Sequence, residues 1–488
     1  EALLTAFGGS DAPAEPSLVP VLRWNIVTGL VALNKAGINA LAAAGMKTPE
    51  TMQNLVEVLD KAVRLPAETV LFIENAQRYI DGDLPRNEKT AACVQAVWNL
   101  RDVFKTDFRA LFLLCPSITL PAELLQDVML LDEAYPSADT LRAIVTSIHE
   151  QANFVAAPET IERAVDALRG LAAYPAEQET AMCLRKDGTL DLPTLWRRKE
   201  AVINNTPGLS IARSTDGYAT LGGLENLKAF LRDVCEGRER PRALVLIDEG
   251  EKQFAGSDGG DRSGTATMQL GALLSYMDGV ARAKQPGIML FGPAGSGKTA
   301  IVRATGAEFG IPTIVWDLSK SQGSGYGGQA GQATASALKT IDAVSDGRAL
   351  FLMTVNRDVS IPPELQRRFL LGSFFVDLPG PAERETIWSI AMRKYELPAQ
   401  PLPDCEDWTG AEIVNCCYKA WALPRIGTLV EAAKTISPVA RKMGDGLKFL
   451  RESAAASRYI SASHEGFYEA PGTEAPTLAS RARGRGMR

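Results

Sequence analysis

Short apolar runs, each closed by polar or turn-forming residues, recur along the first half of the chain. They begin near Val21, Thr69 and Arg109, and segments with a helical period lie between and after them. Runs of this length that are apolar throughout are typical of strands buried in a parallel sheet. An α/β layer is therefore predicted, followed by mostly helical sequence from about 137 to 201.

The second half shows the same alternation with five apolar runs. They read RALVLIDE, GIMLFGP, PTIVWDL, RALFLMTV and GSFFVDLP, and helical patterns separate them. A helical segment follows from about 382 to 458, and sequence rich in proline, glycine and arginine begins at 472. This order predicts a second α/β layer, a helical domain and a disordered end.

A chain of 488 residues is too long for one hydrophobic core, and these changes of pattern divide it. The predicted parts are a flexible N-terminus (1–15), a first α/β domain (16–200), a polar linker (201–217), a second α/β domain (218–381), a helical domain (382–465) and a disordered basic tail (466–488).

The two α/β domains share an internal repeat. VLFIEN, which ends at Asn75, parallels LVLIDE, which ends at Glu249, and RALFLLCPSITLPAEL parallels RALFLMTVNRDVSIPPEL. The first copy has Glu74 and Asn75 in place of Asp248 and Glu249, and it has no GxxxxGK[ST] motif. We interpret it as a degenerate copy with a structural or regulatory role. The alternative is that both halves merely contain similar strands.

The strongest motif is GPAGSGKT at 292–299, which follows the strand-like GIMLF and precedes a predicted helix, AIVRATGAEFG. This is the context that a phosphate-binding loop requires. The glycines let the backbone curl so that N–H groups face the phosphates, while Lys298 reaches the outer phosphates and Thr299 holds magnesium. The predicted nucleotide-binding residues here are Pro293, Ala294, Gly295, Ser296, Gly297, Lys298 and Thr299.

Two acids, Asp248 and Glu249, close the run ALVLIDE. At the exposed end of a buried strand, an Asp can bind the shell of a magnesium ion, and a Glu can deprotonate the water that attacks a γ-phosphate. Asn356, which follows LFLMTV, is a candidate for positioning that water, and the alternative is a plain turn residue. With the phosphate loop, these residues predict that ATP is hydrolysed as well as bound.

The sequence PPELQRRF offers Arg367 and Arg368 as candidate arginine fingers. Such an arginine stabilises the charge on the transferring phosphoryl group and usually acts on the site of a neighbouring subunit. A ring or an open helical oligomer is then implied. For at least one of the two residues, a solvated arginine on a helix is the open alternative.

Composition narrows the function classes. A net charge of -6 gives no basic field, so nucleic acid is not expected as the main partner. The chain has only two histidines and no HExxH motif, which excludes a zinc protease of that kind. No apolar stretch is long enough to span a membrane. Seven cysteines without CxxC spacing indicate a reducing compartment, interpreted as cytoplasmic, and no secretory leader is visible.

GPAGSGKT, LVLIDE, LFLMTVNR, PPELQRRF and WTGAEI together resemble the motif set of AAA+ ATPases of the AAA clade, and the resemblance covers the whole chain. In detail the chain is similar to the chloroplast-reading-frame (Ycf) type, in which a degenerate AAA-like domain precedes YATLGGLENLKAFL and the motor. The resemblance implies an α/β P-loop NTPase fold of AAA+ type, with a parallel sheet flanked by helices and a helical lid. It also implies that Leu221, Gly222 and Gly223 line the adenine pocket, and that Gly410 and Ala411 close it from the lid in place of a sensor arginine.

The same resemblance implies ATP and Mg2+ as cofactors, a ring or helical oligomer with a hexamer expected, and regulation or remodelling of an unknown protein client. Two other functions stay open. One is an ATP-dependent oligomeric scaffold or switch with slow hydrolysis, and the other, less favoured, is a nucleic-acid motor. Polypeptide threading is not favoured, because Tyr326 is the sole aromatic in the loop SKSQGSGYGGQAGQ after the second strand.

The chain order departs from that of the family. LVLIDE precedes the phosphate loop here, whereas the family places it after. Moving 244–283 to follow Ala349 restores the family order, and the strand spacing then comes close to that of the first domain. Permutation, engineering or an ordering fault would each explain the displacement. We expect the five strands to assemble as in the family, with the acid pair facing Lys298.

Overall fold

The computed structural model describes residues 19–47, 49–82, 84–85, 87–115, 118–131, 135–212, 216–254, 265–278, 286–321, 328–356 and 361–471. The chain forms two compact units, Glu1–Glu133 and Ala134–Arg488. Tyr326, the expected flexible N-terminus and most of the expected basic tail lie outside the described residues. Among the described helices, none has both the length and the apolar character needed to cross a membrane.

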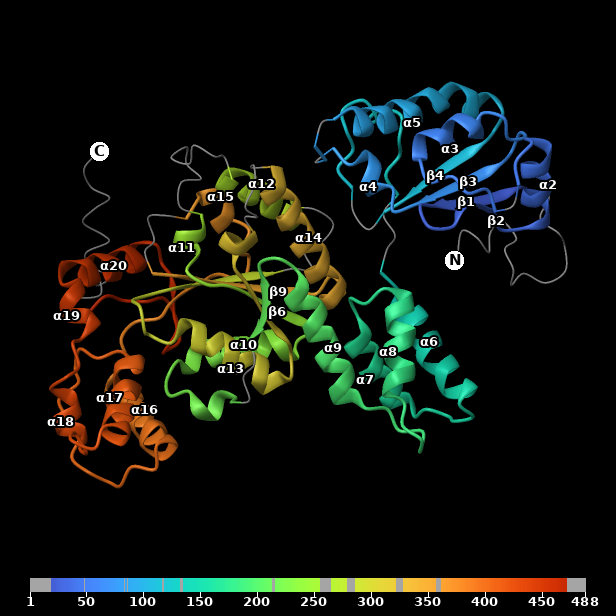
Figure 1. The fold of residues 1–488 in the computed structure, drawn as a ribbon. Coiled ribbons are helices and arrows are strands. Elements are labelled where there is room, and N and C mark those ends of the chain that lie inside the picture. Colours follow the sequence, from blue (N-terminus) through green and yellow to red (C-terminus); the bar gives the residue numbers. More distant parts are fainter. Residues whose placement is uncertain are drawn as a thin grey trace, which may run out of the picture. The chain divides into compact units, whose positions relative to one another are not determined.

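The first unit is a four-stranded sheet in the order β2-β1-β3-β4, with helices packed against one face (Figure 1). Strands β1, β3 and β4 are parallel, and β2 forms a hairpin with β1. Alternate residues of the strands, such as Trp24 and Ile73, are buried against α3 and α5. The elements are β1 (Val21–Asn25), β2 (Gly29–Ala32), α2 (Lys35–Ala43), α3 (Leu55–Ala62), β3 (Val70–Glu74), α4 (Gln77–Ile80), α5 (Glu88–Thr106) and β4 (Ala110–Leu114).

The second unit begins with four helices that share a core of their own. They are α6 (Ala138–Gln151), α7 (Pro158–Leu168), α8 (Ala173–Cys183) and α9 (Leu192–Asn205). The residues expected as a polar linker, 201–217, instead hold the end of α9 and a short strand, β5 (Leu209–Ala212). Because β5 pairs with the edge of the next sheet, its backbone groups are bonded as in a strand and not solvated as in a linker.

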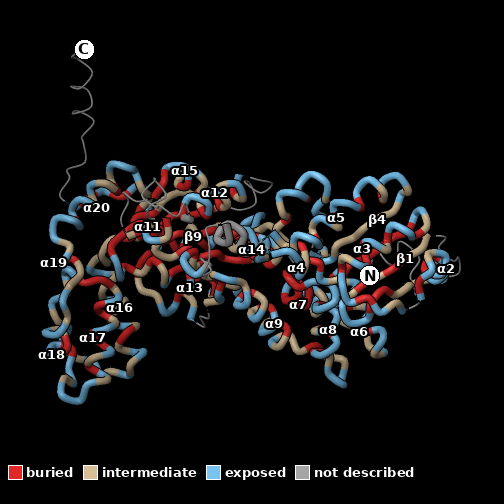
Figure 2. Tube along the Cα trace, turned by 45° about the horizontal axis from the view of Figure 1, so that its top comes forward, coloured by how far each residue is buried: buried red, intermediate tan, exposed pale blue. Residues whose placement is uncertain are grey.

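The main sheet of the second unit has seven strands in the order β11-β10-β7-β9-β6-β8-β5. All residues of β6 (Ala243–Ile247), β7 (Gly287–Phe291) and β9 (Ala349–Val355) are buried (Figure 2). Since strand side chains alternate between faces, such runs require helices on both sides. One face packs against α12 and α14, and the other against α10 and α13.

The remaining elements complete this layer and the lid. They are η1 (Tyr218–Thr220), α10 (Glu225–Glu236), α11 (Gly250–Gln253), α12 (Thr265–Asp278), α13 (Lys298–Phe309), β8 (Thr313–Trp316), η2 (Leu318–Ser321), α14 (Gly328–Ser345), α15 (Pro363–Gln366), β10 (Ser373–Phe375), α16 (Pro381–Lys394), α17 (Gly410–Ala422), α18 (Leu429–Ala433), α19 (Val439–Met443), α20 (Asp445–Ala456) and β11 (Ile460–Ser461).

The predicted helical domain, 382–465, is helical only in part. Helices α16, α17 and α18 share a separate core, as a lid does. The following segment returns to the sheet, because β11 pairs with β10 and Leu450 of α20 lies in the core beneath the strands. A two-residue strand leaves too short a pattern to be read from the sequence.

The order of strands in space differs from their order in the chain. Strand β6 precedes β7 in the sequence but lies between β9 and β8, parallel to both. Two of the proposed joins, 243/244 and 349/350, lie inside β6 and β9. The third, 283/284, lies outside the described residues. The displacement itself stays a prediction.

The backbone supports the internal repeat. Asn75 after β3 and Glu249 after β6 both have positive φ angles, 56° and 52°. A left-handed conformation is uncommon for residues other than glycine. A single-turn helix follows each residue, α4 in the first unit and α11 in the second. Within each unit the two repeated strands also pair in parallel, β3 with β4 and β6 with β9. The first unit therefore has the same strand, turn and helix at the place of the acid pair.

Candidate active site

The phosphate loop joins β7 to α13 at the carboxyl edge of the sheet. Gly292, Gly295 and Gly297 have φ angles of 152°, 82° and 104°, which side-chain-bearing residues rarely adopt. A Cβ atom at Gly292 would lie 2.0 Å from the carbonyl oxygen of Val376. The glycines thus allow the loop to wrap the start of α13, where backbone N–H groups are free for an anion.

Lys298 is the first residue of α13 and is 6% exposed. Its Nζ donates to the carbonyl oxygens of Gly292 and Pro293, at 2.7 and 2.8 Å. Burial lowers the pKa of Lys298 to about 8, and the carboxylates of Glu251, Asp248 and Glu249 oppose this change. A cation held inside the loop is suited to phosphate oxygens.

Asp248 joins the acid strand to the phosphate loop. Thr299 Oγ1 donates to Asp248 Oδ1 at 2.8 Å, and Thr354 Oγ1 donates to the same oxygen. The backbone N–H of Glu249 donates to Thr354 Oγ1 at 2.9 Å. The hydroxyl of Thr299 and the carboxylate of Asp248 are hard oxygen donors of the kind that Mg2+ prefers, so these residues fit the expected metal.

Two further side chains at the site are held by the short helix α11. The carboxylate of Glu249 pairs with Lys252 at 2.7 Å. Asn356 donates from its backbone N and from Nδ2 to the carboxylate of Glu251, at 3.2 and 2.8 Å.

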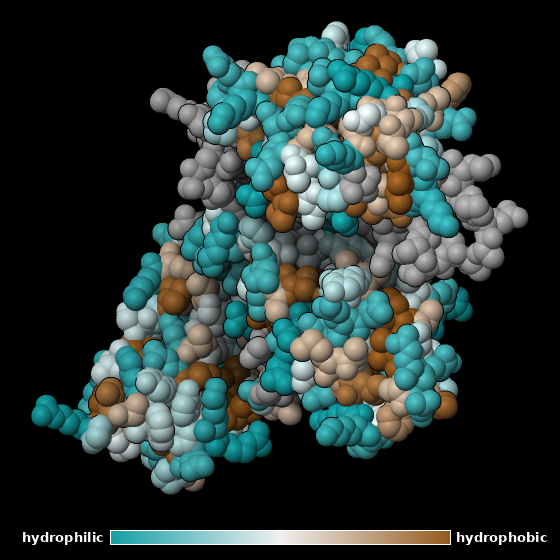
Figure 3. Space-filling model, turned by 45° about the vertical axis from the view of Figure 1, so that its right-hand side comes forward, coloured by the Kyte–Doolittle hydropathy of each residue, from teal (hydrophilic) through white to brown (hydrophobic). Residues whose placement is uncertain are grey.

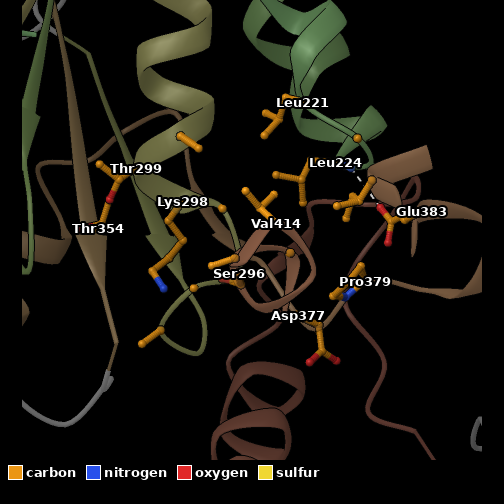
Figure 4. Close-up of a pocket in the computed structure, with 18 of the residues that line it drawn as sticks. Leu221, Leu224, Ser296, Lys298, Thr299, Thr354, Asp377, Pro379, Glu383 and Val414 are labelled. Atoms are coloured by element: carbon orange, nitrogen blue, oxygen red, sulfur yellow. Dashed lines mark hydrogen bonds between the residues drawn. The ribbon is translucent and has the colours of Figure 1, made fainter. Parts of the chain in front are cut away.

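A cavity of about 550 Å³ brings the phosphate loop, the acid strand and the lid together (Figure 4). It is lined by these residues expected from the sequence: Leu221, Gly222, Asp248, Glu249, Ala294, Gly295, Ser296, Gly297, Lys298, Thr299, Asn356, Gly410 and Ala411. The lid lies directly on the loop, because Ala411 N donates to the carbonyl oxygen of Gly295.

Two expected nucleotide-binding residues do not line this cavity. Gly223 faces the lid, where a Cβ atom would lie 2.7 Å from an oxygen of Glu383, so its role here is close packing. Pro293 contributes its carbonyl oxygen to Lys298 and does not face the cavity.

The two arginines also lie apart from the cavity in their own chain. Arg367 is exposed, and no ion pair involves it among the described residues. Arg368 pairs with Asp278 at the end of α12. Neither arginine therefore completes the site within one chain.

Several residues of the cavity were not found from the sequence. Thr354 is the one polar side chain in an otherwise apolar strand, which is a usable signal. Glu383 accepts from Leu224 N at 2.9 Å and from Gly380 N at 2.8 Å, and so ties the lid to the wall of the cavity (Figure 4). An apolar wall comes from Leu224, Ile387, Ile390 and Val414, and Thr220, Asp377 and Pro379 complete the rim.

Family comparisons agree with this architecture. Residues 11–133 match "SpoVK-like AAA ATPase, N-terminal domain", 139–206 match "SpoVK-like AAA ATPase, second domain", and 288–353 match "ATPase family associated with various cellular activities (AAA)". The last match includes the phosphate loop and Thr299 but begins after the acid pair.

Comparison with curated proteins gives no match. Among solved structures, "Crystal structure of FIGL-1 AAA domain" matches at 17% identity, covering 54% of this chain and 85% of that chain, with a TM-score of 0.27. A score this low supports no structural argument. The family matches and the parallel sheet with its lid nevertheless show an AAA+ fold, preceded by an AAA-like domain.

Proposed function

Because this chain is an AAA+ protein, we propose that it binds ATP in the cavity at the phosphate loop and hydrolyses it to ADP and phosphate. The observation that carries the proposal is the bond of 2.8 Å from Thr299 Oγ1 to Asp248 Oδ1. It joins the phosphate loop to the acid strand, although that strand comes earlier in the chain. The phosphate loop and the acid strand thus meet from separate segments of the chain, which supports the proposal.

The residues divide the work of hydrolysis. The N-terminus of α13 and Lys298 hold the phosphates. Glu249 removes a proton from the attacking water, and Asn356 orients that water. Thr299 and Asp248 would hold Mg2+, which would supply positive charge to stabilise the phosphoryl group.

Glu249 is paired with Lys252 in the structure, and both side chains are about half exposed or more, at 47% and 68%. Such surface pairs contribute little, on the order of 0 to 1 kcal/mol. Water and substrate therefore displace Lys252 from Glu249 without large cost. The adenine base lies against the apolar wall, where Gly222 and Ala411 let it approach the backbone.

We further propose that the protein acts as an oligomer, a ring or helix with a hexamer favoured, that remodels or regulates a protein client. The position of Arg367 supports this, because it is exposed and outside the cavity of its own chain. In Figure 3, hydrophilic side chains cover most of the visible surface, and hydrophobic side chains form small groups among them. All seven cysteines are free thiols, which favours a reducing compartment such as the cytoplasm.

The finer family placement, the chloroplast-reading-frame type, and the displacement of 244–283 are also proposals. They are supported by the internal repeat and by the position of β6 between β9 and β8. Peptide mapping by mass spectrometry tests the displacement, since peptides that cross 243/244 and 283/284 exist only if the chain is continuous in this order.

The decisive test of hydrolysis compares Glu249→Gln with the wild type. Glutamine keeps the shape of the side chain but cannot take a proton, so we expect turnover to fall about 100-fold or more while ATP still binds. Glu236→Gln, an exposed change on α10, is the matched control and should leave turnover unchanged. Wild-type rates in Glu249→Gln, or no Mg2+-dependent turnover in the wild type, would contradict the proposal.

The same variant separates a remodeller from a scaffold. ATP-loaded Glu249→Gln should retain a client, and adding that client to the wild type should raise the ATPase rate steeply. A rate that stays constant with the captured partner would favour the scaffold.

A further inference from the structure

The short helix α11 lies tightly against the strand that leads to Asn356. A Cβ atom at its first residue, Gly250, would lie 2.7 Å from Met353 Sδ on β9, so the helix backbone packs closely on this side chain. The left-handed Glu249 immediately before it turns the chain into this contact. As a result, the side chain of Glu251 on α11 reaches Asn356, the residue that follows β9.

Both carboxylate oxygens of Glu251 accept hydrogen bonds from Asn356. Oε1 accepts from Asn356 Nδ2 at 2.8 Å, and Oε2 accepts from the backbone N of Asn356 at 3.2 Å. Its neighbour Lys252 binds Glu249 and not Glu251. The clamp on Asn356 is therefore separate from the contact on the proposed base.

The chemistry of a carboxylate fixes how the amide of Asn356 points. A carboxylate only accepts hydrogen bonds, so the Nδ2 side of the amide must face Glu251. The carbonyl oxygen Oδ1 is then directed away from Glu251, and Asn356 lines the cavity. An oxygen in that position accepts a hydrogen from water and leaves a lone pair of the water free for attack.

We propose that Glu251 is a positioning residue for hydrolysis, which clamps Asn356 so that its carbonyl oxygen orients the attacking water. This inference rests on the proposed function of the cavity. Glu251 acts through Asn356 and neither binds phosphate nor takes the proton.

A different route for Glu251 is also visible. Among the three carboxylates that raise the pKa of Lys298 against the effect of burial, Glu251 has the largest effect. If Glu251 acted through Lys298, its loss would weaken nucleotide binding, with or without Asn356. If it acts through Asn356, its loss slows turnover, leaves binding unchanged and has no further effect once Asn356 is removed.

The test is a double-mutant cycle on the full chain with Glu251→Ala, Asn356→Ala and both together. Turnover is measured with ATP, and affinity with a non-hydrolysable ATP analogue. We expect Glu251→Ala to lower kcat about 10- to 100-fold with KM and Kd within about twofold, as for a small misplacement of a reacting group. Adding Glu251→Ala to Asn356→Ala should change kcat less than about twofold.

Glu251→Gln is the second variant in case Glu251→Ala unfolds the protein. Glutamine keeps one acceptor for Nδ2 but turns a donor toward the backbone N–H of Asn356, so it should lie between the wild type and Glu251→Ala. Glu236→Gln is again the exposed control, and thermal unfolding reports on folding.

The outcomes are distinct. A wild type without turnover overturns both the proposed function and this inference. An active wild type with unchanged kcat in Glu251→Ala overturns this inference alone. A many-fold loss of analogue binding, or effects that multiply in the double variant, overturns it in favour of the route through Lys298.

Discussion

At the scale of single residues, one hydroxyl organises the acid pair. Thr354 is 2% exposed, donates to Asp248 and accepts from the backbone N–H of Glu249. Thr354→Val keeps the shape but leaves both groups without this partner. We expect a loss of about 1 to 3 kcal/mol in the free energy of unfolding and a fall of roughly tenfold in kcat. Denaturant titration and ATPase assays measure both, and Thr354→Ser, which keeps the hydroxyl, should retain most activity.

Lys298 makes nucleotide binding depend on pH. Its pKa is lowered to about 8, first by burial, so the free protein loses this proton as the pH rises through 8. Phosphate favours the charged form of Lys298, so Lys298 takes up a proton when ADP binds above pH 8. The affinity for ADP therefore falls as the pH rises, by up to about tenfold per pH unit. Calorimetry at pH 8.5 in two buffers of different ionisation enthalpy should detect this uptake. Equal enthalpies in both buffers, as expected at pH 7, would count against it.

The residues of the phosphate loop could be predicted because their chemistry is local. Three glycines with positive φ, a lysine and a threonine lie within eight consecutive positions. Glu383 could not be predicted, since its partner Leu224 lies far away in the chain and only folding brings the two together. Thr354 and Glu251 fall between these cases, because each lies beside a recognised motif but bonds to a residue 105 positions away in the chain.

At the scale of elements, Lys199 is a buried charge between helices. It lies on α9 and is 3% exposed. Its Nζ lies over the ring of Trp196 and donates to the carbonyl oxygen of Asp166. Burial lowers its pKa from 10.5 to about 7, while Asp166 opposes this and Arg169 and Arg242 add to it. Between pH 7 and 10.5 the unfolded chain therefore holds more protons than the folded chain, and stability rises with pH.

Lys199→Met removes this dependence. We expect the wild type to gain stability relative to the variant as pH rises from 7 to 9, by up to about 1.4 kcal/mol per pH unit. The free energy of unfolding of the variant, relative to that of the wild type, should be highest at pH 7 and below, where the wild type carries the full cost of a buried charge. Unfolding curves at pH 6, 7, 8 and 9 provide the measurement, and parallel stabilities across this range would contradict the prediction.

Long buried strands and the α/β alternation could be read from the sequence, whereas short edge strands could not. In β6 and β9 every residue is buried, so the apolar runs are unmistakable. In β5 the burial varies from residue to residue, and β11 has two residues. Such strands exist because an edge offers free backbone groups, which is a property of the sheet and not of their own sequence.

At the scale of the whole molecule, the sheet shows why chain order and spatial order can differ. Strand β6 bonds to β8 and β9 in parallel register wherever it lies in the chain, provided its connections reach. Its position beside β9 also brings Asp248 to Thr299. A sequence motif can therefore indicate the chemistry of a site wherever its segment lies in the chain.

The last prediction concerns completion of the site between subunits. Arg367 is exposed and outside its own cavity, while Arg368 is held by Asp278, so Arg367 is the better finger. Arg367→Ala should lower turnover about a thousandfold, and Lys298→Ala should abolish it by removing the phosphate contact. Arg368→Ala is the matched control, with a much smaller loss expected.

Mixing the two inactive variants then decides where the arginine acts. A subunit with Arg367→Ala keeps its phosphate loop, and a Lys298→Ala neighbour supplies the missing arginine. When equal amounts are mixed at random, about one contact in four pairs an intact loop with an intact arginine, so up to about a quarter of the wild-type rate should return. Native mass spectrometry establishes that mixed oligomers form. Mixed oligomers without any recovery would show that Arg367 does not act across the subunit boundary.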